Sequence, residues 1–211
     1  MLEAGQDKMD GSLETKITHT QAFILAGGQS RRMGTDKSQL RIQNQTFTDR
    51  IAETLLAVTS SVTLVGAHQQ NPRFQTVADV YPQWGALGGL HAALANCRCD
   101  WALVVACDLP FVTAELFRQL ASLRSDHDAV VPLQADDRPQ PLAALYRVEP
   151  CLKRANELIQ AGRRRPFDLL ELVKTRWVPF SELRNLDQAD RFFANINTPD
   201  DYEAATMRDL E

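Results

Sequence analysis

The sequence is poor in the features that several common protein classes require. It has only four cysteines and four histidines, no apolar run long enough to span a membrane, and no apolar segment of a secretory signal ahead of its cysteines. Its formal net charge of -4 lacks the basic excess with which nucleic-acid-coating proteins neutralise phosphates. We therefore expect a cytoplasmic protein with reduced thiols that binds neither nucleic acid nor a membrane.

Familiar catalytic and metal-binding patterns are missing as well. Cys97 and Cys99 form C-x-C, but no second cysteine pair at matching spacing accompanies them, which disfavours a cysteine-bound metal. The histidines are scattered, so no Ser-His-Asp or Cys-His arrangement is indicated. The absence of a Walker A sequence and of G-x-G-x-x-G disfavours P-loop hydrolysis and ordinary dinucleotide binding.

The overall composition is that of an ordinary globular domain. The chain has 211 residues, of which 44% are hydrophobic and 24% charged, enough for one compact domain with its own core. Residues 1–18 are polar and show no periodic apolar pattern, so we expect them to form a poorly ordered leader. Residues 19–211 are predicted to form a single domain.

Apolar runs and helical periodicities alternate along that domain. Phe47, Ile51, Leu55 and Val58 recur at the spacing of one helix face, and Thr113 is a good N-cap for a later helix. Further helices are expected near Gly88–Leu94, Cys151–Ala161 and Pro199–Met207, and strands at Gln21–Leu25, Val62–Val65, Thr76–Val77, Trp101–Ala106, Ala129–Val131, Leu142–Tyr146 and Arg176–Val178. This alternation predicts an α/β fold of three layers, an open and mostly parallel sheet with helices on both faces. Ligands of such folds bind beyond the carboxyl ends of the strands.

The loop after the first predicted strand has the chemistry of a phosphate-binding loop. It runs from Leu25 to Lys37 and contains glycines, which expose main-chain N–H groups, together with Arg31, Arg32 and Lys37, which supply positive charge. We expect this loop to bind the phosphates of a nucleotide.

Two carboxylates and two amides follow other predicted strands. Asp108 comes directly after the most apolar run and can bind Mg²⁺, which needs few protein carboxylates besides substrate phosphates. Asp79 opens a loop rich in small residues and can accept hydrogen bonds from a base or a ribose. Asn195 and Asn197 alternate in an extended segment, which places both amides on one face, although Thr198 before Pro199 also reads as an ordinary helix start.

Together these motifs resemble the molybdenum cofactor guanylyltransferases within the wider NTP-transferase group. The resemblance runs from about Gln21 to about Ala205 and is carried by six motifs in order: Leu25-Ala26-Gly27-Gly28, Arg32-Met33-Gly34, Asp36-Lys37, Gly85-x-x-Gly88-Gly89, Cys107-Asp108-x-Pro110 and Asn195-x-Asn197-Thr198-Pro199. It implies a Rossmann-like nucleotidyltransferase fold and transfer of GMP from GTP to the terminal phosphate of molybdopterin, with release of pyrophosphate. Possible further partners are other molybdenum-cofactor proteins and recipient molybdoenzymes.

The resemblance also implies roles for individual residues. Lys37, Asp108 and Arg32 are expected to be catalytic, and Asp108 is expected to hold the Mg²⁺ cofactor. The nucleotide is expected to contact Leu25, Ala26, Gly27, Gly28, Lys37, Asp79, Gly88 and Asp108, and the acceptor Asn195, Asn197 and Arg164. The family often has an asparagine after its second strand, where this sequence has Val65-Gly66, so no role is assigned there.

Other functions fit part of the pattern. A cytidylyltransferase or a sugar-phosphate nucleotidyltransferase would share the fold, although Gly27-Gly28 favours guanine as a family-level cue. A non-catalytic GTP-binding protein that delivers the cofactor would not need Asp108 beside Lys37. The run Arg163-Arg164-Arg165 is either a solvated surface or a contact to the acceptor, and Arg164 is the residue chosen for the second reading.

Overall fold

The computed structural model describes residues 16–27, 41–42, 45–67, 71–196 and 201. The predicted leader lies outside this part up to residue 15, and so does almost all of the predicted helix Pro199–Met207. The strands are β1 (Thr20–Leu25), β2 (Arg41–Ile42), β3 (Gln45–Thr46), β4 (Val62–Val65), β5 (Gln75–Val77), β6 (Trp101–Ala106), β7 (Ala129–Pro132), β8 (Ala143–Arg147) and β9 (Thr175–Val178). The helices are α1 (Phe47–Val58), α2 (Gly85–Asn96), α3 (Ala114–Ser122), α4 (Val148–Gln160), α5 (Pro166–Leu170) and a 3₁₀ turn at Phe180–Glu182.

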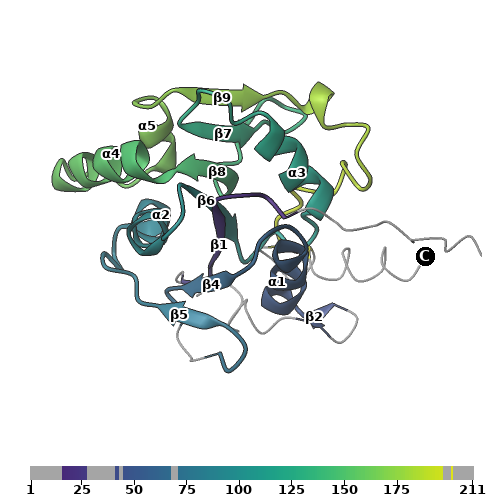
Figure 1. Ribbon diagram of the computed structural model, residues 1–211, viewed down its shortest axis with the longest axis horizontal. Helices are drawn as coiled ribbons and strands as arrows, with labels where there is room; N and C mark the ends of the chain where they lie inside the picture. The colour runs from purple at the N-terminus through teal and green to yellow at the C-terminus, as the bar shows by residue number, and fades with distance from the viewer. Residues whose placement is uncertain (1–15, 28–40, 43–44, 68–70, 197–200, 202–211) are drawn as a thin grey trace, which may run out of the picture.

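Seven strands form one open sheet in the order β5-β4-β1-β6-β8-β7-β9, which can be followed from bottom to top in Figure 1. β1 pairs in parallel with β4 and β6, β4 with β5, and β7 with β9. β8 alone runs antiparallel, to both β6 and β7. The prediction of a mostly parallel open sheet is confirmed.

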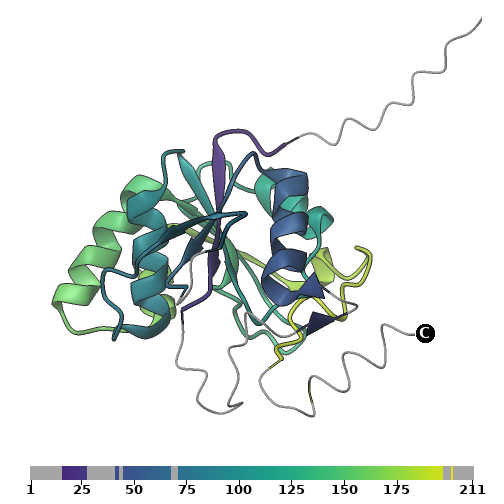
Figure 2. The ribbon, with the colours of Figure 1, turned by 90° about the horizontal axis from the view of Figure 1, so that it is seen from below.

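Helices cover both faces of this sheet, as predicted. α1 and α3 lie on one side, and α2, α4 and α5 on the other (Figures 1 and 2). Within β1, Ala22 and Ile24 belong to the core under α1 and α3, whereas Phe23 and Leu25 belong to the core under α2 and α4. This alternation follows from the period of two in a strand, and apolar residues on both faces of β1 therefore give two cores and three layers.

Helix starts differ most from the sequence-based expectation. α2 begins at Gly85 rather than Gly88, and its N-cap residue Trp84 makes no side-chain capping bond that the sequence could reveal. The N-terminus of α3, capped by the Thr113 hydroxyl, is as predicted. α5 was not expected, because five residues are too few to show a helical period.

The start of the described chain is tied to the domain. Ile17 is buried, and its N–H donates to the Val58 carbonyl at 2.7 Å. The extent of the single domain, residues 19–211, stays a prediction.

Candidate active site at the strand ends

The carboxyl ends of four neighbouring strands lie in one row. Leu25 of β1 is in register with Val65 of β4 and with Ala106 of β6, and Val65 is in register with Val77 of β5. The loops that leave these strands therefore start side by side, at the edge where ligands of open α/β sheets bind.

Two glycines form the middle of this row. The N–H groups of Ala26 and Gly27 both donate to the Val65 carbonyl, at 2.9 and 3.1 Å. A Cβ atom on Gly27 would lie 3.0 Å from the Gly66 carbonyl oxygen, and one on Gly66 would lie 3.0 Å from the Gly27 Cα. Gly66 also has φ +69°, a conformation that costs glycine little. Gly27 and Gly66 therefore touch through main-chain atoms, and neither carries a side chain; we call the surface that they form the floor of the site. The neighbouring Leu25 and Ala26 side chains are buried, so Gly27 is the exposed part of the floor.

Asp79 lies on the β5 side of this floor. Its Oδ1 accepts the Tyr81 N–H at 2.9 Å, and its Cβ lies 3.7 Å from the position of a Cβ on Gly66. A Cβ on Gly88 would lie 3.3 Å from that same Oδ1 and 2.5 Å from the Tyr81 carbonyl oxygen. Glycine at position 88 thus lets the Asp79 loop pack directly on the first turn of α2.

The aromatic side chains of this loop connect it to the run of arginines. The Trp84 ring lies 6.1 Å from the Tyr81 ring, which in turn meets the His91 ring edge-on at 5.0 Å. The Arg164 guanidinium lies over the Trp84 ring, 5.0 Å from its centroid. Arg164 is itself exposed, so the structure places an accessible cation next to the Asp79 loop.

Arg163 has a different environment from Arg164. Its guanidinium donates two hydrogen bonds of 2.9 Å to the buried carboxylate of Asp168. These bonds lower the pKa of Asp168 and raise the pKa of Arg163. Arg163 therefore anchors the start of α5.

Asp108 lies on the β6 side of the floor, together with Asn195. The Asp108 carbonyl accepts the Ile196 N–H at 3.2 Å, which ties the predicted acceptor-binding segment to the predicted metal-binding loop. Asn195 is exposed and Asp108 is partly exposed. Arg164 and Asn195, both expected at the acceptor, are thus anchored on opposite sides of the row, Arg164 beside the Asp79 loop and Asn195 beside Asp108.

The residues around Asp108 fit Mg²⁺ in one particular way. Within the described ranges, no group of three or more His, Cys, Asp and Glu side chains could hold a metal by itself. Mg²⁺ usually keeps water and binds one or two carboxylates together with substrate phosphates. A single carboxylate at a ligand-facing strand end suits that mode of binding, and not an all-protein cage.

Asp79 and Asp108 follow strands that are not neighbours in the sheet. β5 and β6 are three strand spacings apart in the sheet, about 14 Å at the usual spacing, so Asp79 and Asp108 lie on opposite sides of the β1 and β4 ends. A ligand that contacts both must lie across Gly27 and Gly66. The arrangement suits an elongated ligand with a polar group at one end and an anionic group at the other.

Four predicted site residues, Gly28, Arg32, Lys37 and Asn197, lie outside the described residues. Among the others, the structure brings Asp79, Gly88 and Arg164 together on one side and Asp108 with Asn195 on the other, and Gly27 lies between them. Sequence reasoning gave no role to Gly66 or Trp84. Glycine directly after a strand was a signal for Gly66, whereas Trp84 had none, because its contact with Arg164 is set by the tertiary fold.

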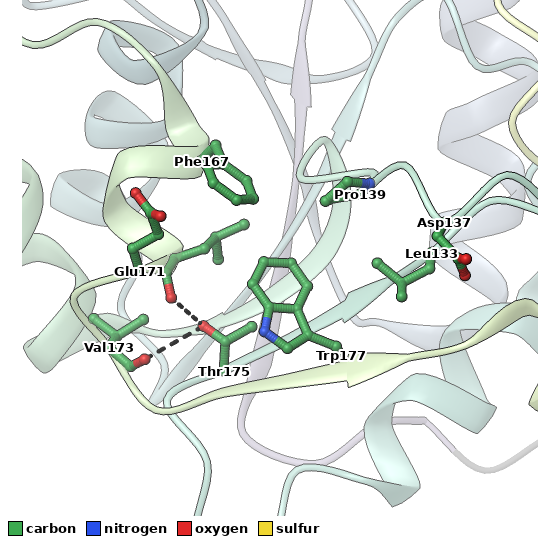
Figure 3. A pocket seen from close by; sticks show the side chains of 9 residues that line it. Leu133, Asp137, Pro139, Phe167, Glu171, Val173, Thr175 and Trp177 are labelled. Carbon is green, nitrogen blue, oxygen red and sulfur yellow. Dashed lines mark hydrogen bonds between the residues drawn. The ribbon is translucent and has the colours of Figure 1, made fainter.

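A separate pocket of about 630 Å³ lies at the β9 edge of the sheet (Figure 3). The Phe167 and Trp177 rings lie next to each other in its lining, tilted by 34° with centroids 6.0 Å apart. It is lined by Leu133, Asp137, Pro139, Phe167, Leu170, Glu171, Val173, Thr175 and Trp177. None of the predicted site residues that the structure describes lines this pocket.

Comparison with known proteins identifies relatives of this chain. Residues 22–175 match the family described as the MobA-like NTP transferase domain. A probable molybdenum cofactor guanylyltransferase from Pelotomaculum thermopropionicum is 35% identical over 187 residues, which cover 87% of this chain and 90% of the relative. Another from Methanosarcina mazei is 32% identical over 214 residues, covering 93% and 94% of the two chains.

Solved structures show the same fold. Molybdopterin-guanine dinucleotide biosynthesis protein A from Archaeoglobus fulgidus superposes with a TM-score of 0.77 at 26% identity, over 90% of this chain and 98% of that one. The 2-C-methyl-D-erythritol 4-phosphate cytidylyltransferase from Thermus thermophilus superposes with a TM-score of 0.66 at 13% identity, over 90% and 98% of the chains, which shows a shared fold alone.

Proposed function

The chain belongs to the MobA-like NTP transferase family and is a nucleotidyltransferase, and from this premise we propose that it transfers GMP from GTP to molybdopterin and releases pyrophosphate. The observation that carries the proposal is the row of strand ends, where two carboxylates flank a floor made by Gly27 and Gly66. Relatives named molybdenum cofactor guanylyltransferase, at 35% and 32% identity, support guanine and molybdopterin as the substrates.

In this proposal the nucleotide lies across the floor, with its nucleoside toward Asp79 and its phosphates toward Asp108. The Asp79 carboxylate is prearranged by the Tyr81 N–H and by close packing on Gly88, so it can accept hydrogen bonds from the nucleoside without reorganising. Gly28 belongs with Leu25, Ala26 and Gly27 to the nucleotide loop, and Arg32 and Lys37 supply positive charge to the phosphates.

Asp108 is the residue that would hold Mg²⁺, which when bound neutralises charge on the phosphates. We assign Asn195 and Asn197 to the binding of the acceptor. Arg164, whose guanidinium lies over the Trp84 ring, is assigned to the acceptor as well. An acceptor phosphate is already an anion near neutral pH, so attack on the α-phosphorus needs alignment and charge neutralisation but no strong base. Transfer of the product to other molybdenum-cofactor proteins or to molybdoenzymes is a further part of this proposal.

Nucleotide binding and turnover test the proposal directly. We expect tighter binding of GTP than of CTP or ATP in the presence of Mg²⁺, and formation of the guanine dinucleotide from molybdopterin. Asp108→Ala and Lys37→Ala should each lower kcat by about a hundredfold or more. Asp100→Ala is a matched control, because Asp100 lies at the opposite end of β6 and is exposed.

The possible outcomes separate the candidate functions. A preference for CTP would assign a cytidylyltransferase activity, and tight GTP binding without turnover would assign a cofactor-delivery role. Equal activity of Asp108→Ala and Asp100→Ala would refute the role given to Asp108.

As for location, no helix in the part of the chain that the structure describes is long and apolar enough to cross a membrane. The cytoplasmic location stays a prediction.

A further inference from the structure

The loop that carries Asp108 has a second anchor from a different part of the chain. Phe111 follows Asp108 by three residues and is buried in a small cluster with Ile42, Phe47 and Ile196. Two guanidinium groups lie over its ring, that of Arg50 at 5.5 Å from the centroid and that of Arg191 at 4.1 Å. Cations over an aromatic face are attracted by its quadrupole, most strongly when partly desolvated, as both these arginines are.

These contacts hold the main chain on either side of Asp108. Arg50 comes from α1, and its Nε donates to the Pro110 carbonyl at 3.1 Å. Arg191 comes from the segment that continues to Asn195 and Ile196, and the Ile196 N–H donates to the Asp108 carbonyl at 3.2 Å. The Leu109 N–H donates to the Ala106 carbonyl, which closes the turn after β6 at 3.3 Å. The Asp108 loop is therefore fixed from α1 on one side and from the 191–196 segment on the other.

We propose that Arg191 and Arg50, stacked on Phe111, are positioning residues that set the Asp108 carboxylate for the metal and keep the Asn195 segment in register with it. This inference rests on the proposed function, since it assumes a divalent metal at Asp108. The same contacts join the metal-binding loop to the acceptor-binding segment, so loosening them should weaken metal binding and acceptor affinity together while nucleotide binding without metal is preserved.

The chain offers a matched control at the other end of the same strand. Trp101 begins β6, and the Arg147 guanidinium lies over its ring at 5.9 Å. Arg147→Gln thus removes a cation from an aromatic ring at the start of β6, far from Asp108. Arg191→Gln removes a cation from a ring just beyond the end of β6, close to Asp108. A general effect of losing such a contact would appear in both variants.

The test is Mn²⁺ binding measured by electron paramagnetic resonance with GTP present, on wild type, Asp108→Ala, Arg191→Gln, Arg191→Lys and Arg147→Gln, each checked for folding by thermal melting. We expect the Mn²⁺ dissociation constant to rise about three- to tenfold in Arg191→Gln and less in Arg191→Lys, which keeps a cation near the ring. Arg147→Gln should bind Mn²⁺ as the wild type does. Steady-state kinetics should show a raised KM for the acceptor in Arg191→Gln but not in Arg147→Gln.

Two failures are distinguishable. If Asp108→Ala binds Mn²⁺ as the wild type does, the metal is not at Asp108, and both the proposed function at this residue and the inference are overturned. If Asp108→Ala loses Mn²⁺ while a folded Arg191→Gln binds it no worse than Arg147→Gln does, the positioning role alone is wrong.

Discussion

Replacement of Gly88 by alanine should disturb the nucleotide side of the site, chiefly through the shortest of the contacts that a Cβ would make there. A Cβ at this position would lie 2.5 Å from the Tyr81 carbonyl oxygen, which is main chain and can yield only if the loop moves. Forcing an atom into such a space usually costs about 1–3 kcal/mol. Alanine in a helix interior recovers about 1 kcal/mol relative to glycine, so the net loss of stability should be about 0–2 kcal/mol.

Gly89→Ala is the control that isolates this contact. It gives the same gain in helix propensity, but its Cβ would meet a terminal methyl of Leu25 at 3.3 Å, a side-chain atom that can shift. Gly88→Ala should therefore unfold at lower urea concentration than Gly89→Ala, by about 1–3 kcal/mol in free energy of unfolding. Because the Tyr81 N–H holds the Asp79 carboxylate, moving Tyr81 should also weaken GTP binding about tenfold, as expected for loss of a hydrogen bond to a charged group. Equal stability and equal GTP affinity of the two variants, by denaturation and calorimetry, would refute the reasoning.

Three further predictions concern the arginine run and a buried thiol. Arg163→Gln should lower the melting temperature by a few degrees and leave the affinity for the acceptor unchanged. Arg164→Gln should leave the melting temperature unchanged and lower the affinity for the acceptor, and the reverse result would exchange the two roles. The Arg163 bonds hold the pKa of Asp168 below its unfolded value of about 3.9, so this stabilisation is present above about pH 4 and is lost as pH falls through the folded pKa. Stability of Asp168→Asn should accordingly depend less on pH than that of the wild type between about pH 5 and 3, in urea titrations at each pH. Burial raises the pKa of Cys151 to about 12, so this thiol should react with a thiol reagent at pH 8 only after unfolding, and fast labelling in the native protein would contradict its burial.

The sheet could be predicted from sequence where burial leaves a simple pattern. All six residues of β6 are buried, and the sequence shows them as an unbroken apolar run. In α1, Phe47, Ile51, Leu55 and Val58 all face the core at helical spacing. Both elements are specified by their own residues, and their predicted bounds match the structure closely.

The site could be predicted only in part, because its contacts join distant segments. Asp79 and Asp108 were recognisable as carboxylates after strands. In contrast, Gly27 and Gly66 leave no room for a side chain on each other because β1 pairs with β4, which the sequence does not show. Likewise, nothing near Arg164 indicates Trp84 as its neighbour. A sequence shows which residues reach an edge of the sheet, whereas the strand order decides which of them meet.

The strand order also gives the two sides of the site separate supports. Asp79 depends on the Tyr81 N–H and on α2 through Gly88, whereas Asp108 depends on α1 and the 191–196 segment through Phe111. The two touching glycines between them join the two sides through main-chain atoms, and we expect little change of side-chain position to pass through them. Mutations at distant, independent sites usually have additive effects, so the double variant Gly88→Ala, Arg191→Gln should lose as much free energy of unfolding as the two single variants together. Strong coupling between the two losses would refute the independence of the two supports.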